Sequence, residues 1–270
     1  MALKEKKRRY ILGAVIGDVI GSVFEFNNVK TTDFPLFSQG STFTDDSVLT
    51  LATMFSILFD SEYDHAYQIF ARNYPDRGYG GSFGEWISSD DPRPYNSWGN
   101  GSAMRVSPVG WAYDNIEDVL ENAKLSAEVT HNHPEGIKGA QAVAAAVFLA
   151  RKHKSKDEIK DFISVHFGYD LDRSIAEIRP HYYFNESCQG TVPEAIIAFL
   201  ESRDFEDAIR LAVSLGGDSD TIACITGSIA EAFYGSVPEY IIDNTLRVLP
   251  KEMINIIEVF SLEYRKEKEA

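Results

Sequence analysis

The stretch "PEGIKGAQAVAAAVFLARKH" at residues 134–153 carries the clearest information about the fold. It is rich in alanine, the strongest helix former, and its apolar residues fall on more than one face of a helix. A proline stands where the first helical turn would begin, a position that tolerates proline. The pattern therefore predicts a buried helix.

Helical periodicity dominates much of the rest of the chain. Residues 193–202 and 205–215 predict a pair of helices that is broken at Arg203–Asp204. Residues 217–235 run from a Gly-Gly turn to a glycine stop, and residues 238–270 predict a short helix followed by a long one. The second half of the chain is therefore expected to be almost entirely helical.

Strand patterns are scarce, and "HYYFNES" at 181–187 is the one short candidate. Residues 74–100 are rich in Gly, Pro, Ser and aromatic side chains, and we expect a long functional loop there, at the entrance to a pocket. The fold class is therefore predicted to be all-α. We expect one compact multi-helix domain over residues 1–270, with a basic tail at 1–9 and a charged tail at 264–270.

The charge balance excludes some classes of partner. The chain of 270 residues has 26 basic and 41 acidic side chains and a net charge of −15. Such a surface repels nucleic-acid backbones and anionic lipid, so we expect neither bulk nucleic-acid binding nor membrane binding. A small ligand that carries phosphate remains compatible, provided that a local metal or backbone-amide site offsets the field.

The N-terminal segment superficially resembles a signal peptide, because a basic stretch precedes an apolar one. Asp18 and Glu25 interrupt the apolar part, and no small-residue cleavage site is obvious, so we expect a solvated tail that leads into a helix. No apolar run approaches the ~20 residues that span a bilayer. The two cysteines, Cys188 and Cys224, indicate no disulfide framework, and a reducing cytoplasm is the expected compartment.

The segment "GAVIGDVIGSVFEF" at 13–26 predicts an unusual helix. Glycine recurs at every fourth residue, on one face: Gly13, Gly17 and Gly21. Each glycine costs roughly 1 kcal/mol relative to alanine inside a helix, so three of them indicate close packing against another backbone. Asp18 and Glu25 are two turns apart and would also share a face. They are either functional or simply exposed.

Two separate acidic clusters each open an apolar segment. In "TFTDDSV" (42–48), either Thr44 or Asp45 could cap the following helix, and two acids there also interact favourably with the helix dipole. In "GGDSDT" (216–221), a tight Gly-Gly turn precedes Asp218. One such cluster is weak evidence for a metal site, but two, each with an adjoining threonine, are much stronger together.

Oxygen ligands of this kind suit hard divalent cations such as Mg²⁺ and Mn²⁺. The candidate metal ligands are Thr44, Asp45, Asp46, Asp218, Asp220 and Thr221, with Glu25 as a further candidate. They could form a two-ion site with the ions roughly 3.5–4 Å apart. His and Cys do not occur at tetrahedral zinc spacing, which disfavours zinc.

Two further stretches suggest ligand contacts. In "SWGNGSAMRVSPVGW" (97–111), glycines free the backbone to approach a phosphate, and Arg105 either grips that phosphate or ties down the loop. In "THNHPEG" (130–136), we expect His131 to contact the ligand. The alternative is that His131 only forms hydrogen bonds at the start of a helix.

These stretches, in this order, resemble the ADP-ribosylglycohydrolase family, in particular the bacterial type that includes dinitrogenase reductase-activating glycohydrolase. The resemblance runs from about Ile11 to Tyr234. Its most specific parts are "GAVIGDVIGSVFE", "FTDDSVLTLA", "GNGSAMRVSPVGW", "THNHPEGIKGA" and "GGDSDTIACITGSIAEAFYG", and "CQGTVPEAIIAFLES" at 188–202 is also typical of bacterial members.

The resemblance implies an all-α fold with a centre of two Mg²⁺ or Mn²⁺ ions, held by the six metal-ligand candidates given above. It implies a catalytic role for Glu25, and Asp46 of the expected metal shell is the alternative candidate for taking a proton. The substrate-binding residues that it implies are Asn100, Gly101, Ser102, Met104, Arg105 and His131. Departures are small: Ser47 and Ser219 stand where threonine is common, and Ser102 replaces a small apolar residue. Because no acid is lost, we expect an active enzyme.

The expected activity is hydrolysis of the glycosidic bond between ADP-ribose and a modified protein side chain or small molecule, with release of ADP-ribose. Three alternatives remain: a non-catalytic ADP-ribose-binding protein, a structural crystallin-like protein, and a metal-dependent nucleotide phosphohydrolase. The sequence does not distinguish arginine, serine, nucleobase and O-acyl linkages. A monomer is the working expectation for the oligomeric state.

Overall fold

The computed structural model describes residues 10–265, which form helices joined by turns and loops, with no strand among them. The predicted basic tail at 1–9, and the predicted charged tail beyond Arg265, lie outside the described residues. In the first half of the chain the helices are α1 (Gly13–Gly21), α2 (Asp45–Phe59), α3 (Tyr63–Asn73), α4 (Gly81–Ser88), α5 (Gly101–Met104), α6 (Ser107–Ala112) and α7 (Ile116–Glu128). The second half contributes α8 (Pro134–Arg151), α9 (Lys156–Phe167), α10 (Ile175–Ile178), α11 (Cys188–Glu201), α12 (Phe205–Val213), α13 (Ser219–Tyr234), α14 (Glu239–Val248) and α15 (Lys251–Tyr264). The all-α prediction is confirmed.

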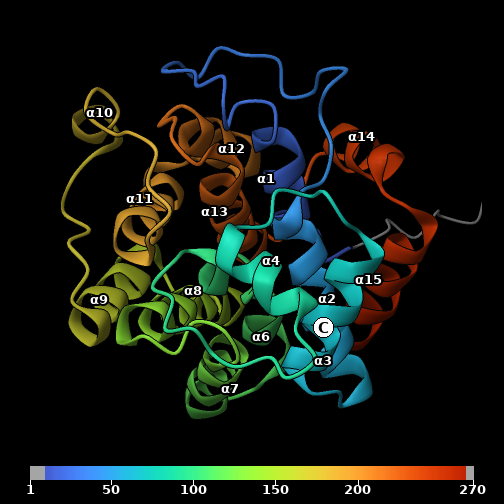
Figure 1. Cartoon of the computed structure of the whole chain (residues 1–270). Helices are drawn as coiled ribbons and strands as arrows, with labels where there is room; N and C mark the ends of the chain where they lie inside the picture. The colour runs from blue at the N-terminus through green and yellow to red at the C-terminus, as the bar shows by residue number, and fades with distance from the viewer. Residues whose placement is uncertain (1–9, 266–270) are drawn as a thin grey trace, which may run out of the picture.

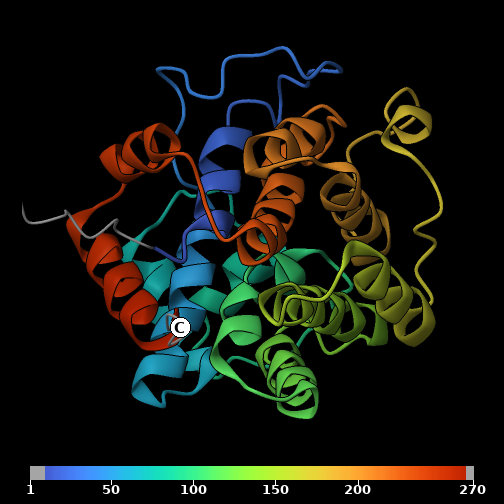
Figure 2. The same cartoon turned by 180° about the vertical axis from the view of Figure 1, so that it is seen from behind.

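Helices α1 and α13, far apart in the sequence, lie side by side in the middle of the molecule (Figures 1 and 2). The glycines of α1 make this possible. A Cβ atom added to Gly17 would lie 2.0 Å from the carbonyl oxygen of Ala223, and one on Gly21 would lie 2.4 Å from the Cα of Asp220. The predicted close backbone packing is thus confirmed. It places the C-terminal half of α1 against the N-terminal turn of α13.

Helix α8 forms a second centre of the core, and its bounds agree with the prediction for 134–153. It packs against α5, α6, α7, α11 and α13, and its alanines from Ala142 to Ala146 are fully buried. A Cβ atom on Gly110 of α6 would lie 2.7 Å from the oxygen of Ala144, so small residues again let two helices approach closely. The buried apolar side chains around both centres belong to one continuous cluster.

Several details differ from the sequence-based expectations. Helix α11 begins at Cys188 rather than at Pro193, because Ser187 caps it by accepting from the Gly190 amide and the helix tolerates the proline inside. The irregular region 74–100 contains α4. The strand expected at 181–187 is wrong: Ser187 forms only an isolated antiparallel bridge with Gly99, since no second strand lies beside it within the described residues.

The helix predicted over 13–26 is shorter than expected. It ends at Gly21, where the Phe24 amide donates to the Gly21 carbonyl at 2.7 Å and turns the chain away. Asp18 and Glu25 therefore do not share a helical face, and Glu25 lies in the loop that follows. Near the other end of the chain, Tyr264 closes α15 and Arg265 contacts Glu231 at 2.5 Å, so the predicted tail at 264–270 starts within packed structure.

None of the helices formed by residues 10–265 combines the length and hydropathy that a membrane crossing requires.

Candidate active site

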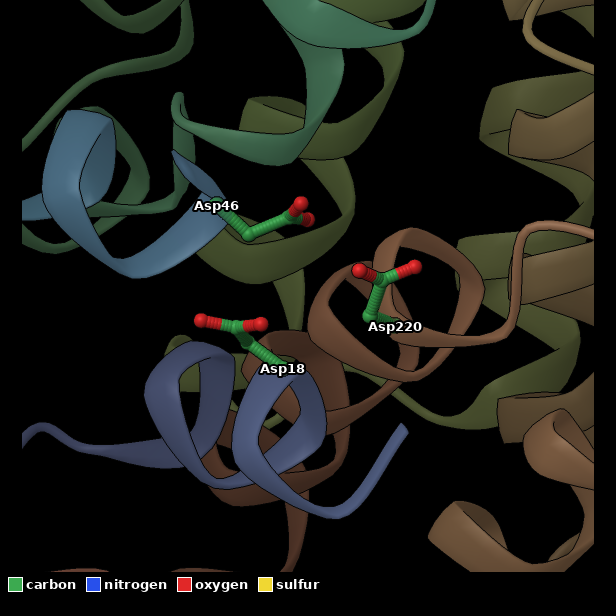
Figure 3. A group of neighbouring side chains, drawn as sticks. All are labelled: Asp18, Asp46 and Asp220. Atoms are coloured by element: carbon green, nitrogen blue, oxygen red, sulfur yellow. The ribbon is translucent and has the colours of Figure 1, made fainter. Parts of the chain in front are cut away.

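Three buried aspartates meet where α1, α2 and α13 approach one another. Asp18 comes from α1, Asp46 from the first turn of α2 and Asp220 from the first turn of α13, and their carboxylates turn toward one another (Figure 3). One oxygen of each lies within 4.8 Å of the others. The glycines that bring α1 onto α13 are thus what bring Asp18 to Asp220.

Asp18 was missed as a metal-ligand candidate. It is fully buried and accepts from the Thr44 amide at 2.9 Å, the Thr44 hydroxyl at 2.7 Å, the Ser47 amide at 3.1 Å and the Ser47 hydroxyl. These bonds join α1 to the start of α2. The glycine-rich pattern of 13–26 indicated close packing of this helix but not which helix covers it, so it did not single out Asp18.

A second cluster shares Asp220 with the first. Oxygens of Glu25, Asp218 and Asp220 lie within 4.8 Å of one another. The loop that carries Glu25 is held by Asn28, whose amide group donates to the Glu25 carbonyl at 2.8 Å and to the Gly217 carbonyl at 3.0 Å. Asn28 also accepts from the Gly217 amide at 2.8 Å. One side chain thus ties the Glu25 loop to the turn that begins α13.

The Gly-Gly turn before α13 is the predicted tight turn. Gly216 and Gly217 have φ values of +69° and +72°, a backbone conformation that favours glycine. A Cβ atom on Gly217 would also lie 2.6 Å from the ring of Tyr182. The turn places Asp218 at the N-cap position of α13. Its side chain forms no capping hydrogen bond with the backbone of that helix, so its carboxylate is free to contribute to the acid cluster.

Burial and mutual repulsion act on these acids. Burial raises the pKa of Asp18, and it raises the pKa of Asp45, Asp46 and Asp220 well above the ordinary value, with neighbouring carboxylates adding to the effect at these three. Burial, followed by the charges of Asp218, Asp18 and Glu186, raises the pKa of Glu25 to about 7. None of these acids forms an ion pair with a lysine or arginine among residues 10–265.

The donor set fits divalent cations. Asp46 Oδ1 is shielded from solvent and has no hydrogen-bond partner within the described part of the chain, while its Oδ2 accepts from the Thr221 hydroxyl at 3.2 Å. Buried carboxylates with unfilled oxygens are costly unless a cation pairs with them. All donors are oxygens, which Mg²⁺ and Mn²⁺ prefer. Clusters around Asp18 and around Glu25, joined at Asp220, could hold one ion each.

The remaining metal-ligand candidates occupy different places. Thr44 is the N-cap of α2, accepting from the Asp46 amide, as one of the two capping hypotheses predicted. Asp45 belongs to neither group of three, and one of its oxygens lies 3.3 Å from the point where Gly78 would carry a Cβ atom, so it faces the 74–100 region. Metal ligation by Thr44, Asp45 and Thr221 stays a prediction.

Five of the acids, Glu25, Asp45, Asp46, Asp218 and Asp220, form the floor of a cavity of about 780 Å³, whereas the fully buried Asp18 lies outside its lining. Its walls come from the Glu25 loop, the 74–100 region, the segment from Asn100 to Arg105, His131 and residues 184–187. Asn100 joins wall to floor, because its side-chain amide donates to Asp218 at 2.7 Å and to Thr191 at 3.1 Å. A cavity of this size, with carboxylates at the bottom and aromatic side chains at the rim, accommodates a small organic ligand.

The sequence profile of the ADP-ribosylglycohydrolase family matches residues 1–268. The chain belongs to this family. It is 30% identical to the ADP-ribosylhydrolase ARH3 of Mus musculus over 86% of this chain and 85% of the relative, and equally similar to ARH3 of Homo sapiens, with 86% of each covered. A putative ADP-ribosyl glycohydrolase of Acanthamoeba polyphaga mimivirus is 26% identical over 89% of this chain and 91% of its own length.

The fold is also that of the family. A solved structure described as an ADP-ribosylglycohydrolase-related protein complex superposes with a TM-score of 0.73, covering 94% of this chain and 96% of the other at 24% identity.

The substrate-binding residues expected from the family do not all face the cavity. Asn100, Gly101, Met104, Arg105 and His131 border it. Ser102 is fully buried and donates to the Gly136 carbonyl at 2.8 Å, so it joins α5 to α8. Its role in substrate binding stays a prediction that these contacts do not favour.

Arg105 is fully buried, and its contacts favour the second of its two hypotheses. Its Nη2 donates to the Ser126 carbonyl at 2.9 Å and to the Thr130 hydroxyl at 2.8 Å, and its guanidinium lies 4.0 Å from the centre of the Tyr67 ring. Nε and Nη1 are shielded from solvent. In this conformation the guanidinium ties the loop to α7.

His131 and His133 have different roles at the start of α8 and at the cavity. His133 caps α8, its Nδ1 accepting from the Glu135 amide at 3.1 Å. His131 borders the cavity beside Gly99 and Gly101. Because His133 serves the helix start, the interpretation of His131 as only a helix-entry residue is not supported.

Exposed aromatic side chains at the cavity rim were not singled out from the sequence. Trp98 is 53% exposed and Phe184 is 46% exposed, and both border the cavity. Phe184 stacks on Phe26, the neighbour of Glu25, with ring centres 6.4 Å apart. The segment "HYYFNES" is rich in aromatic residues, but we interpreted it as a strand candidate and did not predict that Phe184 borders the cavity.

Proposed function

We propose that this chain is a single-domain, metal-dependent hydrolase that cleaves the glycosidic bond between ADP-ribose and a modified side chain or small molecule, releasing ADP-ribose. The observation that carries the proposal is the pair of acid clusters joined at Asp220, which lies on the floor of a ligand-sized cavity. Membership of the ADP-ribosylglycohydrolase family supports the same reaction class. The relatives named as ADP-ribosylhydrolases support it as well.

We further propose two Mg²⁺ or Mn²⁺ ions. Asp18, Asp46 and Asp220 would hold one, and Glu25, Asp218 and Asp220 the other, with Thr44, Asp45 and Thr221 completing the ligand set. Such ions supply charge neutralisation and activation of water near neutral pH.

Among the chain's own groups, Glu25 is the better candidate than Asp46 for moving a proton. Glu25 is partly exposed at the edge of the cavity floor, whereas Asp46 is 2% exposed and has one oxygen engaged by Thr221. In the metal-free chain, burial and the neighbouring carboxylates raise the pKa of Glu25 to about 7. Cations bound at Asp218 and Asp220 would lower that pKa again and keep Glu25 as a carboxylate base.

The geometry also suits the charge that develops on the sugar. Glycosidic cleavage passes through a transition state with positive charge at the anomeric carbon, which nearby carboxylates stabilise. Asn100 holds Asp218 in place and the Thr44 and Ser47 hydroxyls hold Asp18, so these carboxylates are oriented before a substrate arrives. Pre-oriented charge costs no reorganisation during the reaction.

The test is a release assay on arginine-, serine- and nucleobase-linked ADP-ribose and on O-acyl ADP-ribose. Each is measured with Mg²⁺, with Mn²⁺ and with chelator. The variants are Asp218→Asn and, as a control, Asp172→Asn, an exposed acid paired with Lys160 on the surface. We expect metal-dependent release of free ADP-ribose by the wild type and the control, with loss of release in Asp218→Asn.

Other products contradict the proposal. AMP or phosphate would indicate a nucleotide phosphohydrolase. Tight ADP-ribose binding in calorimetry without any release would indicate a binding protein, and neither binding nor release would leave a structural role.

A further inference from the structure

The two acid clusters differ in the structure that carries them. One, the helix cluster, consists of Asp18, Asp46 and Asp220, and the other, the loop cluster, consists of Glu25, Asp218 and Asp220. Every acid of the helix cluster lies on a helix and is almost fully buried. Glu25, in contrast, lies in the loop after α1 and is partly exposed. The position of Glu25 therefore depends on what holds this loop.

Charge does not hold Glu25 in place in the metal-free chain. An oxygen of Glu25 lies within 4.8 Å of oxygens of Asp218 and Asp220, and like charges at this separation repel one another. Glu25 forms no ion pair with a lysine or arginine among residues 10–265. Contacts of the loop itself must therefore oppose the repulsion.

The side chain of Asn28 makes such contacts, which we call the Asn28 clasp. Its Nδ2 donates to the carbonyls of Phe24 at 2.7 Å, Glu25 at 2.8 Å and Gly217 at 3.0 Å, and its Oδ1 accepts from the Gly217 amide at 2.8 Å. Gly217 directly precedes Asp218 in the chain. The Asn28 clasp thus joins the backbone of one acid of the loop cluster to the residue before another.

The surroundings of Asn28 fix the orientation of its amide group. Three carbonyl oxygens face Nδ2, and one backbone N–H faces Oδ1. Rotating the amide by 180° would set Oδ1 against the carbonyl oxygens and the NH₂ group against the N–H, so these hydrogen bonds would be lost. The clasp therefore holds one arrangement of the loop.

A second anchor of the loop, Lys30, does not involve Glu25. Its Nζ donates to the Tyr182 carbonyl at 2.7 Å and to the Leu215 carbonyl. Lys30 therefore attaches the loop to the protein, whereas Asn28 binds the backbone of Glu25 itself.

We propose that Asn28 is a positioning residue: by joining Glu25 to the turn before Asp218, it strengthens ion binding at the loop cluster and leaves the helix cluster unchanged. The ion part rests on the proposed function, which supplies the two divalent cations. The clasp part concerns the protein alone.

The first experiment measures binding of Mn²⁺ alone to the full chain, by electron paramagnetic resonance of the free ion. Asn28→Ala removes the clasp. Asn27→Ala is the matched control, because Asn27 is a neighbouring exposed asparagine whose side chain donates to the Val23 carbonyl at 3.5 Å rather than to Glu25. Groups that orient metal ligands contribute 10- to 100-fold to metal affinity. We expect two ions in the wild type and the control, and in Asn28→Ala one unchanged affinity and one weakened about tenfold.

The second experiment is a double-mutant cycle that shows whether Asn28 acts through Glu25. Glu25→Gln should weaken the same ion that Asn28→Ala weakens. In the Glu25→Gln background, Asn28→Ala should add less than twofold, because no carboxylate remains to be positioned and Asn100 still holds Asp218. Effects that multiply would show that Asn28 supports the turn independently of Glu25, and would overturn the proposal.

The third experiment tests the clasp without any ion. The Gly217 amide donates to Asn28, so in the metal-free chain its hydrogen exchange should be about tenfold faster in Asn28→Ala and unchanged in Asn27→Ala. Unchanged exchange in Asn28→Ala would overturn the clasp.

The outcomes separate the two claims. Equal weakening of both Mn²⁺ affinities in Asn28→Ala, or no weakening, would overturn the positioning role. A wild type that binds no Mn²⁺ would contradict the two-ion part of the proposed function, and hydrogen exchange at Gly217 would still decide whether Asn28 holds the Glu25 loop.

Discussion

The floor and the rim of the cavity are built on opposite principles. The floor is formed where α1, α2 and α13 meet, with backbones nearly in contact at Gly17 and Gly21, with Asp18 held by Thr44 and with Asp218 held by Asn100. The segment 74–100, which contributes to the rim, includes glycines at which an added Cβ atom would meet nothing within 4 Å, such as Gly80 and Gly84, and the rim carries exposed aromatic rings. A floor that tight can hold only one arrangement of charges, whereas the rim can change without disturbing the fold. We therefore expect the chemistry to depend on the floor and substrate choice to depend on the rim.

The largest effect is expected from Asp220, because both acid clusters include it. Asp220→Asn removes one charge from each candidate ion site while keeping the oxygen that accepts from the Thr221 amide. Loss of a metal ligand removes several kcal/mol of transition-state stabilisation, so we expect activity to fall on the order of a thousandfold. The metal-free variant should melt at a higher temperature than the metal-free wild type, since a buried like charge has gone. A lower melting temperature without metal would show that repulsion in the floor is not significant.

The close contact of α1 and α13 is tested by a pair of identical substitutions. In Gly17→Ala the new Cβ atom would lie 2.0 Å from the backbone of Ala223, which cannot move aside as a side chain can. We expect about 3 kcal/mol of destabilisation in denaturant titration. Gly84→Ala, in α4, meets no atom within 4 Å and should be neutral or slightly stabilising. Equal effects of the two substitutions would contradict the contrast between floor and rim.

The pH dependence of metal-free stability follows from the raised pKa values of Asp45, Asp46 and Asp220. Between the ordinary pKa and the raised one, the folded state binds more protons than the unfolded chain does, so stability falls as pH rises through that window. Bound cations remove this cost, and a metal at 100 times its Kd adds about 2.7 kcal/mol.

We therefore expect Mg²⁺ or Mn²⁺ to raise the melting temperature more at pH 7.5 than at pH 5, because ligands must be deprotonated to bind. Chelator should abolish the difference. A metal-induced shift that is the same at both pH values would contradict the assignment of these acids as the ligands.

Asn100 is the direct link between wall and floor, and its effect should be intermediate. Asn100→Ala removes the bonds to Asp218 and Thr191. Residues that orient a metal ligand typically contribute 10- to 100-fold to metal affinity, and we expect about tenfold weaker activation by Mn²⁺ in titrations of activity. Asn185→Ala alters another amide side chain of the cavity wall, one that no hydrogen bond joins to the acids, and should leave metal activation unchanged.

Much of the floor could be predicted from the sequence, because its signals are local. Two acids beside a threonine at a helix start, and a Gly-Gly turn before Asp218, each have few structural explanations. Asp18 could not be assigned, since the pattern 13–26 shows neither that α1 ends at Gly21 nor which helix covers it. The alternatives for Arg105 also needed the structure: its burial depends on Tyr67, Ser126 and Thr130, which are distant in sequence.

For the rim, the sequence predicted only which region of the chain would border the cavity, not its structure. Residues 74–100 do border the cavity, as expected, but α4 inside that region and the contribution of residues 184–187 were not foreseen. Contacts between segments that are distant in sequence hold these loops, such as the hydrogen bond from the Asn100 amide to the Glu186 carbonyl at 2.7 Å. Such contacts cannot be predicted from the local periodicity of the sequence.

The smallest effect, and the sharpest test of the division between floor and rim, concerns Phe184. Phe184→Ala removes an exposed ring that borders the cavity and stacks on Phe26, so we expect unfolding free energy to change by no more than about 0.5 kcal/mol. KM for the preferred substrate should rise severalfold, and the ranking of arginine-, serine- and nucleobase-linked substrates should change, while kcat and metal activation stay the same. Tyr183→Ala is the matched control, because Tyr183 is 77% exposed and lies outside the cavity lining. If Phe184→Ala instead lowers kcat or metal affinity, the ring supports the Glu25 loop through Phe26, and the rim belongs to the catalytic structure rather than to substrate choice alone.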